Sequence, residues 1–206
     1  MISNLLLDRH SFFRPWCYMD DCFDKSQLNN LSEYVANNGE YKEGTVYNSE
    51  ENFELNKVRR SNIKFFNYKP DTFWIFNVFN NVIENLNNRF YGFDFHGYNF
   101  FQYAEYNSEN LGKYEWHMDM GFDNTDVPRH EHTRKLSLVM LLNEQGVDFE
   151  GGDFLINLST ENKIDKLPLI PGRIVAMPSF ILHKVTPVTK GIRKSIVVWV
   201  TGPNFK

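Results

Sequence analysis

The sequence predicts a mainly β fold, a sandwich or barrel of short strands with helices packed on its outer face. Two observations predict it. The second half of the chain alternates short apolar segments with turns that contain Gly or Pro, which is typical of antiparallel strands. The first half carries two stretches whose apolar residues recur at helical spacing. For 206 residues we expect one domain, in which residues 1–92 support a core formed by residues 93–206.

The first expected helix begins after Asp24, which forms with Gln27 the pattern of a capping box. Its apolar stripe consists of Leu28, Leu31 and Val35. Gly39 is typical of a residue that ends a helix. This spacing predicts an amphipathic helix that covers apolar surface.

The second expected helix begins after Asp71, which can serve as its N-cap, and ends near Gly92. Its stripe comprises Phe76, Phe79, Val82, Ile83, Leu86 and Phe90. The aromatic run at 73–76 at the start of this helix is interpreted as core rather than as a binding platform.

Six strands are expected in the second half, at residues 98–106, 136–142, 153–158, 173–177, 181–185 and 193–201. Turns at 151–152, 171–172 and 189–191 separate the later ones. Residues 41–62 fit neither pattern, and we expect a mobile hairpin or loop there. Their acidic and then basic side chains predict a solvated face, and a lid over the substrate is the alternative.

Composition excludes several classes of protein. The formal net charge of −4 argues against a nucleic-acid-binding protein that neutralises phosphates. No apolar run approaches the roughly 18 residues that cross a bilayer, so no membrane partner is expected. Residues 1–9 lack the features of a signal peptide. Cys17 and Cys22 are interpreted as free thiols of a cytoplasmic protein.

His117 and Asp119 are the centre of the functional interpretation. In a strand they would lie on one face, with an imidazole beside a carboxylate. The pair alone is weak evidence, because a histidine at a strand end next to a solvated aspartate is common. His183, in a later expected strand, adds a second imidazole. Two histidines and one carboxylate are the facial triad of non-haem Fe(II) oxygenases, which leaves positions open for a 2-oxo acid and O₂.

Arg193 begins the last expected strand and shares one face with Ser195, Val197 and Trp199. An inward charge in so apolar a strand is costly unless it is paired. A guanidinium there can bind the far carboxylate of a 2-oxo acid in a bidentate manner. The alternative is a salt-bridged cation at a strand end.

The chain resembles a known family over about residues 58–203. It is similar to the 2-oxoglutarate- and Fe(II)-dependent dioxygenases of the prolyl 4-hydroxylase branch, including the PKHD-type hydroxylases. The resemblance rests on Tyr106, the segment 114–119, the strand at 136–143, and the segments 150–153, 171–173 and 183–199. It implies a double-stranded β-helix, also called a jelly roll or cupin-like fold, with the N-terminal helices packed on one sheet.

The resemblance also implies roles for individual residues. His117, Asp119 and His183 would be the Fe(II) ligands, and Arg193 would bind the 5-carboxylate of 2-oxoglutarate. Four further residues would lie at the cosubstrate: Tyr106, Ser195, Gln102 and Trp199. Relatives that place Tyr or Thr after the metal motif differ from this chain, which has only aliphatic residues and Met at 138–142.

The implied reaction consumes 2-oxoglutarate and O₂, hydroxylates a C–H bond, and releases succinate and CO₂. The first expectation for the substrate is a prolyl or other side chain of a protein or peptide. A free amino acid or small metabolite is the alternative substrate, and a non-catalytic jelly-roll binding module is the alternative of another class. Asp119 disfavours a halogenase, because those enzymes typically lack the carboxylate ligand and so free a coordination site. His130 and His132 are interpreted as part of a solvated loop.

Overall fold

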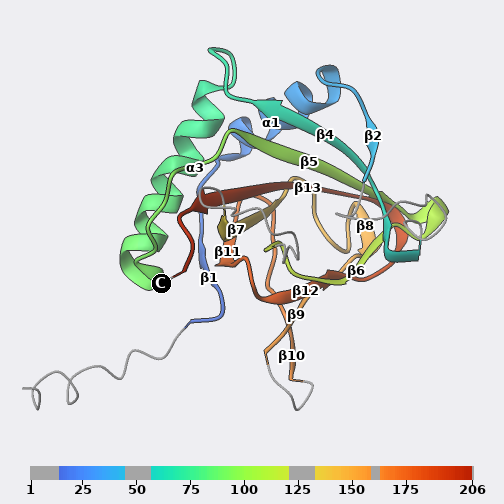
Figure 1. Ribbon diagram of the computed structural model, residues 1–206. Helices are drawn as coiled ribbons and strands as arrows, with labels where there is room; N and C mark the ends of the chain where they lie inside the picture. The colour runs from blue at the N-terminus through green and yellow to red at the C-terminus, as the bar shows by residue number, and fades with distance from the viewer. Residues whose placement is uncertain (1–13, 45–56, 121–132, 159–162, 206) are drawn as a thin grey trace, which may run out of the picture.

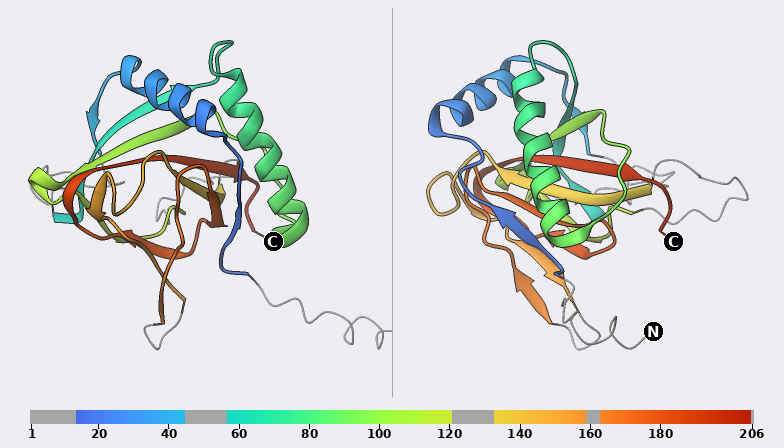
Figure 2. Two further views of the ribbon diagram at one scale, coloured as in Figure 1. Left: turned by 180° about the vertical axis from the view of Figure 1, so that it is seen from behind. Right: turned by 90° about the vertical axis from the view of Figure 1, so that its left-hand side faces the viewer.

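The computed structural model describes residues 14–44, 57–120, 133–158 and 163–205. Two antiparallel sheets face each other, and helices α1 (Lys25–Asn37) and α3 (Phe73–Leu86) lie on the outer face of the larger sheet (Figures 1 and 2). This arrangement confirms a mainly β fold with helices packed on one sheet. Within the described residues, no helix is both long and apolar enough to cross a membrane.

The larger sheet has the strand order β1-β11-β7-β13-β5-β4-β2, with β8 paired to β13. Its strands are β1 (Cys17–Met19), β2 (Lys42–Glu43), β4 (Asn62–Asn67), β5 (Phe100–Asn107), β7 (Thr133–Leu141), β8 (Phe149–Gly151), β11 (Ile174–Pro178) and β13 (Val188–Gly202). The smaller sheet has the order β10-β9-β12-β6-β3. Its strands are β3 (Arg59–Arg60), β6 (Lys113–His117), β9 (Phe154–Asn157), β10 (Ile164–Lys166) and β12 (Leu182–Val185).

Alternating side chains on the central strands give the larger sheet two apolar faces. On β7, Leu138 and Met140 pack under the helices, whereas Val139 and Leu141 point between the sheets. The inner face packs against Phe154, Ile156 and Val185 of the smaller sheet. The long β13 crosses the larger sheet and follows β12 of the smaller one (Figure 1). Side chains that point between the sheets are therefore held by two packed layers.

Helix α1 confirms the expected capping box. The Asp24 carboxylate accepts from the Gln27 backbone N–H at 2.8 Å, and the Gln27 side chain accepts from the Asp24 N–H at 3.0 Å. The helix ends at Asn37, and Gly39 follows with a φ of +73°. Its C-terminus is capped by a buried cation, because Lys64 Nζ donates to the carbonyls of Val35, Ala36 and Asn38.

Helix α3 differs from the expectation at its start. The N-cap is Thr72, which makes no side-chain cap bond, and Asp71 instead accepts from the Tyr34 hydroxyl at 3.0 Å. The expected apolar stripe is buried as far as Leu86, and the chain continues as a π-helix, η2 (Asn87–Tyr91), to Gly92. The aromatic run at its start is only partly core, because Phe73 is exposed.

All six expected strands are present, with ends shifted by a few residues. The stretch 41–62 is not a single hairpin in its described parts. Its start, β2, pairs with β4 in the larger sheet, whereas β3 pairs with β6 in the smaller one. Residues 45–56 lie outside the described residues, so a lid there remains a prediction. Cys17 and Cys22 are free thiols, as predicted.

Candidate metal centre and anion cradle

Three predicted side chains meet at one end of the space between the sheets. His117 ends β6, Asp119 lies two residues further on, and His183 lies on β12, directly opposite His117 in the antiparallel pairing. The Asp119 carboxylate lies 3.8 Å from His117 Nε2 and 3.6 Å from His183 Nε2. The candidate ligand atoms all fall within 4.8 Å of one another. Because β6 ends at His117, a bend rather than the strand pleat presents Asp119.

Both imidazoles are oriented in the same way. Nδ1 of His117 lies 2.7 Å from the Glu115 carbonyl, and Nδ1 of His183 lies 2.7 Å from the Ile181 carbonyl. A carbonyl only accepts, so each Nδ1 carries the proton and each Nε2 is left with a free lone pair. Backbone carbonyls of this kind fix the tautomer of metal-binding histidines. The two Nε2 atoms therefore face Asp119 as ligands.

Aromatic rings hold the two histidines from behind. The Tyr114 ring stacks on His117 with centroids 3.4 Å apart, and Phe154 stacks on His183 at 5.3 Å. The guanidinium carbon of Arg59 lies 4.6 Å from the centroid of the Tyr114 ring. Packing of this kind restricts rotation of the imidazoles and keeps them in position without the metal.

Burial keeps His117 neutral. Burial, followed by the charge of His183, lowers the pKa of His117 to about 3. Burial opposes ionisation of Asp119, but His183, His117 and a hydrogen bond from Ser137 bring the pKa of its carboxyl below the usual value. Two neutral imidazoles and one carboxylate are the donor set that a divalent cation needs.

Arg193 is buried between the sheets, where two hydrogen-bond acceptors form a cradle for its guanidinium. Its side chain is 1 % exposed, and burial lowers the pKa of the guanidinium to about 10, which leaves it cationic at neutral pH. Nε donates to the Gly152 carbonyl at 3.1 Å, and Nη1 donates to Ser195 Oγ at 2.8 Å. Nη2 is buried and has no hydrogen-bond partner among the described residues. One arm of the fork is therefore free for an anion.

The other predicted cosubstrate residues share this inner face. Tyr106 lies opposite Arg193 in the β5–β13 pairing, and its ring centroid is 5.4 Å from the guanidinium carbon. Gln102, opposite Val197, is buried. Trp199 lies opposite Ser137, at the Asp119 end of the site, and its buried Nε1 has no partner among the described residues.

Ser137 and Arg134 on β7 were not predicted. Besides its bond to Asp119, Ser137 Oγ lies 2.9 Å from Ser179 Oγ. The Arg134 guanidinium lies 4.2 Å from the Trp199 ring, and Nη1 donates to the Asp119 carbonyl at 3.3 Å. Arg134 lies in the polar run 133–135 that precedes the apolar part of β7, whereas Ser137 has no distinctive sequence signal. His130 and His132 lie outside the described residues.

The residues fit an iron and a 2-oxo acid. The two Nε2 atoms and the Asp119 carboxylate lie within 4.8 Å of one another, close enough to hold one cation, and three protein ligands leave the other positions of an octahedral iron to a cosubstrate and O₂. The unpaired Nη2 of buried Arg193 supplies the hydrogen-bond donor that a carboxylate requires.

Comparison with known proteins agrees with this geometry. Residues 101–201 match the family described as the 2OG-Fe(II) oxygenase superfamily, and this range contains the three candidate ligands and Arg193. A PKHD-type hydroxylase of Synechococcus sp. (strain CC9902) is 34% identical over 88 residues, covering 42% of this chain and 35% of the relative. One from Picosynechococcus sp. is 42% identical over 65 residues, covering 32% of this chain and 28% of that protein. The matched segment thus spans about a third of these curated relatives or less.

Solved structures resemble the fold over nearly the whole chain. A prolyl-4-hydroxylase from Pseudomonas putida has a TM-score of 0.69 at 16% identity, covering 92% of this chain and 94% of that one. A prolyl hydroxylase from Trichoplax adhaerens, solved with a peptide fragment, has a TM-score of 0.71 at 17% identity, covering 91% and 84%. These likenesses confirm the double-stranded β-helix predicted from the sequence.

Proposed function

Because this chain belongs to the 2OG-Fe(II) oxygenase superfamily, in its prolyl hydroxylase-like PKHD branch, we propose that it hydroxylates a C–H bond of a protein or peptide side chain, with proline as the first candidate. The observation that carries the proposal is the combination of a preoriented His-Asp-His set with a buried arginine whose fork is one arm short of satisfaction. A binding module without catalysis would need neither two histidines held in the same tautomer nor a buried arginine with an unpaired Nη2.

Each residue has a defined task in this proposal. His117, Asp119 and His183 would hold Fe(II), and Arg193, with Tyr106 beside it, would hold the far carboxylate of 2-oxoglutarate. When bound, the iron supplies the O₂ chemistry that converts 2-oxoglutarate to succinate and CO₂ and delivers one oxygen atom to the substrate. The Gly152 carbonyl and Ser195 Oγ orient the guanidinium before the cosubstrate arrives. Phe154, which stacks on His183, belongs to the apolar core between the sheets and gives the site an apolar wall.

The peptide substrate is supported by the type of relative found. One of the similar structures holds a peptide fragment bound to a prolyl hydroxylase. A free amino acid remains the competing substrate. Stimulated 2-oxoglutarate consumption, measured with a panel of peptides against a panel of free amino acids, separates the two. The two free thiols support a cytoplasmic location, which belongs to the same proposal.

The test is formation of succinate from 2-oxoglutarate by the purified chain. We expect it to require both Fe(II) and O₂ and to be abolished by His117→Ala. His96→Ala, which removes an exposed histidine outside the site, is the matched control and should retain the activity. Undiminished turnover in His117→Ala, or turnover without iron, would refute the proposal.

A further inference from the structure

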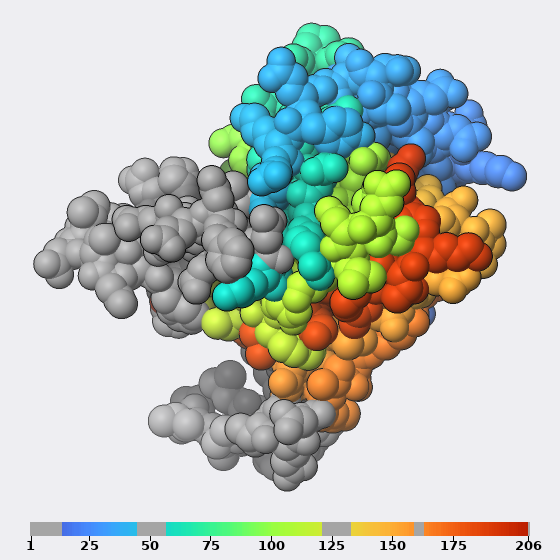
Figure 3. Space-filling view, turned by 90° about the vertical axis from the view of Figure 1, so that its right-hand side faces the viewer, coloured from blue at the N-terminus to red at the C-terminus, as the bar shows by residue number. Residues whose placement is uncertain are grey.

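Two buried serines lie next to the candidate carboxylate ligand. Ser137 shares the inner face of β7 with Val139 and Leu141, and Ser179 directly follows β11. Both serines are 0% exposed, and their Oγ atoms are 2.9 Å apart. Figure 3 shows one outer face of the packed layers, with the N-terminal elements in blue and cyan above strands in green and red. Because the serines lie inside these layers, their hydroxyls take their hydrogen-bond partners from the protein.

The carboxylate sets the direction of the hydrogen bonds in this group. The Ser137 hydroxyl bonds to the Asp119 side chain, and an ionised carboxylate only accepts, so the single proton of Ser137 points to Asp119. Ser137 Oγ can then only accept from Ser179, whose hydroxyl is the donor of the 2.9 Å bond. Both bonds run one way, from Ser179 through Ser137 to Asp119, and are called here the serine relay. Hydrogen bonds in such a chain polarise and strengthen one another.

Ser179 also holds the backbone of the ligand segment. Its carbonyl accepts from the Met120 N–H at 3.0 Å, and its own N–H donates to the Lys135 carbonyl at 3.0 Å. Met120 is the neighbour of Asp119, so Ser179 fixes this segment at the backbone and, through the relay, at the carboxylate. The segment needs this support because β6 ends at His117, two residues before Asp119.

The turn that carries Ser179 supports a second candidate ligand. A hydrogen bond of 3.0 Å from the Ile181 N–H to the Pro178 carbonyl closes this turn. The Ile181 carbonyl lies 2.7 Å from Nδ1 of His183 and so fixes that imidazole. One turn therefore orients two of the three candidate ligands, Asp119 through the relay and His183 through a carbonyl.

We propose that Ser137 is a positioning residue for the metal centre, and that its hydroxyl, supported by Ser179, holds the Asp119 carboxylate toward the two imidazoles before a cation binds. The inference rests on the proposed function and concerns how that same site acquires its metal. A carboxylate outside the strands can rotate about its side-chain bonds, and ordering it in advance lowers the entropic cost of binding. Ser179 acts only through Ser137 and through the backbone.

The experiment is a calorimetric titration of Mn(II) alone into the full-length, metal-free chain. Ser137→Ala removes the donor to the carboxylate, and we expect the Mn(II) dissociation constant to rise by about 10- to 100-fold. Ser137→Thr keeps a hydroxyl on the same carbon and should bind Mn(II) nearly as tightly as the wild type. Ser179→Ala removes only the second donor and should weaken binding several-fold.

The double variant tests the relay itself. In Ser137→Ala the Ser179 hydroxyl no longer reaches the carboxylate through a partner, so its removal should have no further effect on Mn(II) affinity. The losses of the two single variants should therefore not add. A purely structural role of two independent serines would instead give additive losses.

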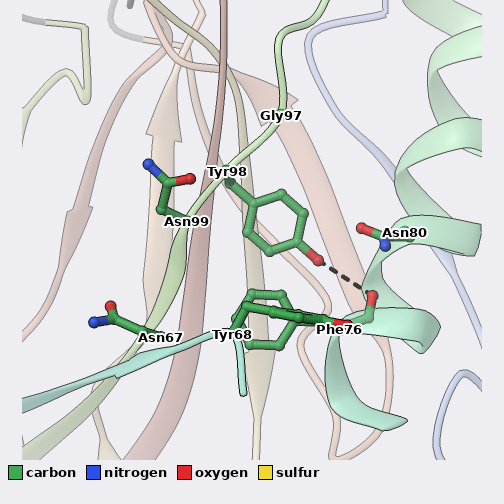
Figure 4. Close-up of a pocket in the computed structure, with 7 residues that line it drawn as sticks. All are labelled: Asn67, Tyr68, Phe76, Asn80, Gly97, Tyr98 and Asn99. Atoms are coloured by element: carbon green, nitrogen blue, oxygen red, sulfur yellow. Dashed lines mark hydrogen bonds between the residues drawn. The ribbon is translucent and has the colours of Figure 1, made fainter. Parts of the chain in front are cut away.

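Tyr98→Phe is the matched control for loss of one hydroxyl bond. Figure 4 shows the Tyr98 hydroxyl donating to the Phe76 carbonyl, beside a pocket that α3 helps to line. Tyr98 packs on the helix-covered core, which lies on the other side of the larger sheet from the metal centre. We expect Tyr98→Phe to lose stability, measured by urea unfolding, and to keep the wild-type Mn(II) affinity.

Unchanged Mn(II) affinity in Ser137→Ala would overturn the proposal. So would an equal loss in folded Ser137→Thr, because the shape of the side chain rather than its hydroxyl would then matter. A loss of affinity in Tyr98→Phe, or additive losses in the double variant, would likewise count against the relay. Failure of the proposed function gives a different result, since the wild-type chain would then bind no Mn(II), or would form no succinate with Fe(II), O₂ and 2-oxoglutarate.

Discussion

Replacing Gly152 with alanine tests how the arginine cradle is built. Gly152 has a φ of +62°, and its carbonyl accepts from Arg193 Nε. A Cβ at this position would lie 2.9 Å from Arg193 Cδ and 3.0 Å from Val188 Cγ2. Real Cβ atoms do not tolerate the first distance, and the second leaves the Cβ little room to move away from Arg193 toward Val188. The guanidinium must therefore shift away from the position in which its free arm faces the site.

Two separate costs follow from this geometry. The left-handed backbone costs an L-residue about 1–2 kcal/mol of folding stability, wherever it occurs. Displacement of Arg193 weakens a buried hydrogen bond from a charged group, worth about 1.5–3 kcal/mol. If this second cost falls on cosubstrate binding, the dissociation constant for 2-oxoglutarate rises by about 10- to 150-fold.

The assay is calorimetric titration of 2-oxoglutarate into the Mn(II)-loaded chain, with the free energy of unfolding measured in parallel. Gly92→Ala is the matched control, because Gly92 has a φ of +64° and an added Cβ there meets nothing within 4 Å. We expect both variants to lose stability through the left-handed backbone, Gly152→Ala to lose more because of the clash, and only Gly152→Ala to lose affinity. If the two folded variants bind 2-oxoglutarate equally well, Gly152 does not position Arg193 and the reasoning is wrong.

Further predictions follow from single contacts. Ser195→Ala should raise the dissociation constant for 2-oxoglutarate several-fold in the same titration, because Arg193 Nη1 loses its acceptor. An unchanged constant would show that the Gly152 carbonyl alone is enough to orient the guanidinium. Lys64→Met should lower the free energy of unfolding by about 3 kcal/mol in urea, because three carbonyls at the end of α1 lose a buried charged donor, and activity per folded molecule should persist. Asp24→Ala should cost about 1 kcal/mol through loss of the N-cap, and Asp24→Asn should recover most of it.

The parts of the fold that were predictable have a strong local signal. The capping box at Asp24 and the apolar stripe of α3 involve only residues within a few turns of each other, so periodicity identifies them. β4 was not predicted because Lys64 interrupts its apolar pattern. That lysine is buried only because the end of α1 supplies three carbonyl acceptors, a contact between segments distant in sequence.

The candidate site divides in the same way. His117, Asp119 and His183 could be identified because two histidines and one carboxylate form the pattern of a facial triad, and Arg193 because an inward charge in an apolar strand is costly unless it is paired. Ser137 and Gly152 carry no such signal. A serine on an apolar strand and a glycine in a turn are common, and their contacts with Asp119 and Arg193 join segments that are distant in sequence. Asp71 had a sequence signal that did not hold, because its carboxylate accepts from the Tyr34 hydroxyl instead of capping α3.

The most direct test of the central claim is an anaerobic titration of Fe(II) into the purified chain with 2-oxoglutarate present. A 2-oxo acid chelated to Fe(II) produces a visible absorption band, which reports the metal and the cosubstrate together. We expect the band to saturate at one iron per chain and to be lost in Asp119→Ala. In Arg193→Ala it should require far more 2-oxoglutarate. Saturation at wild-type concentrations in both variants would contradict the claim that these four side chains form one site.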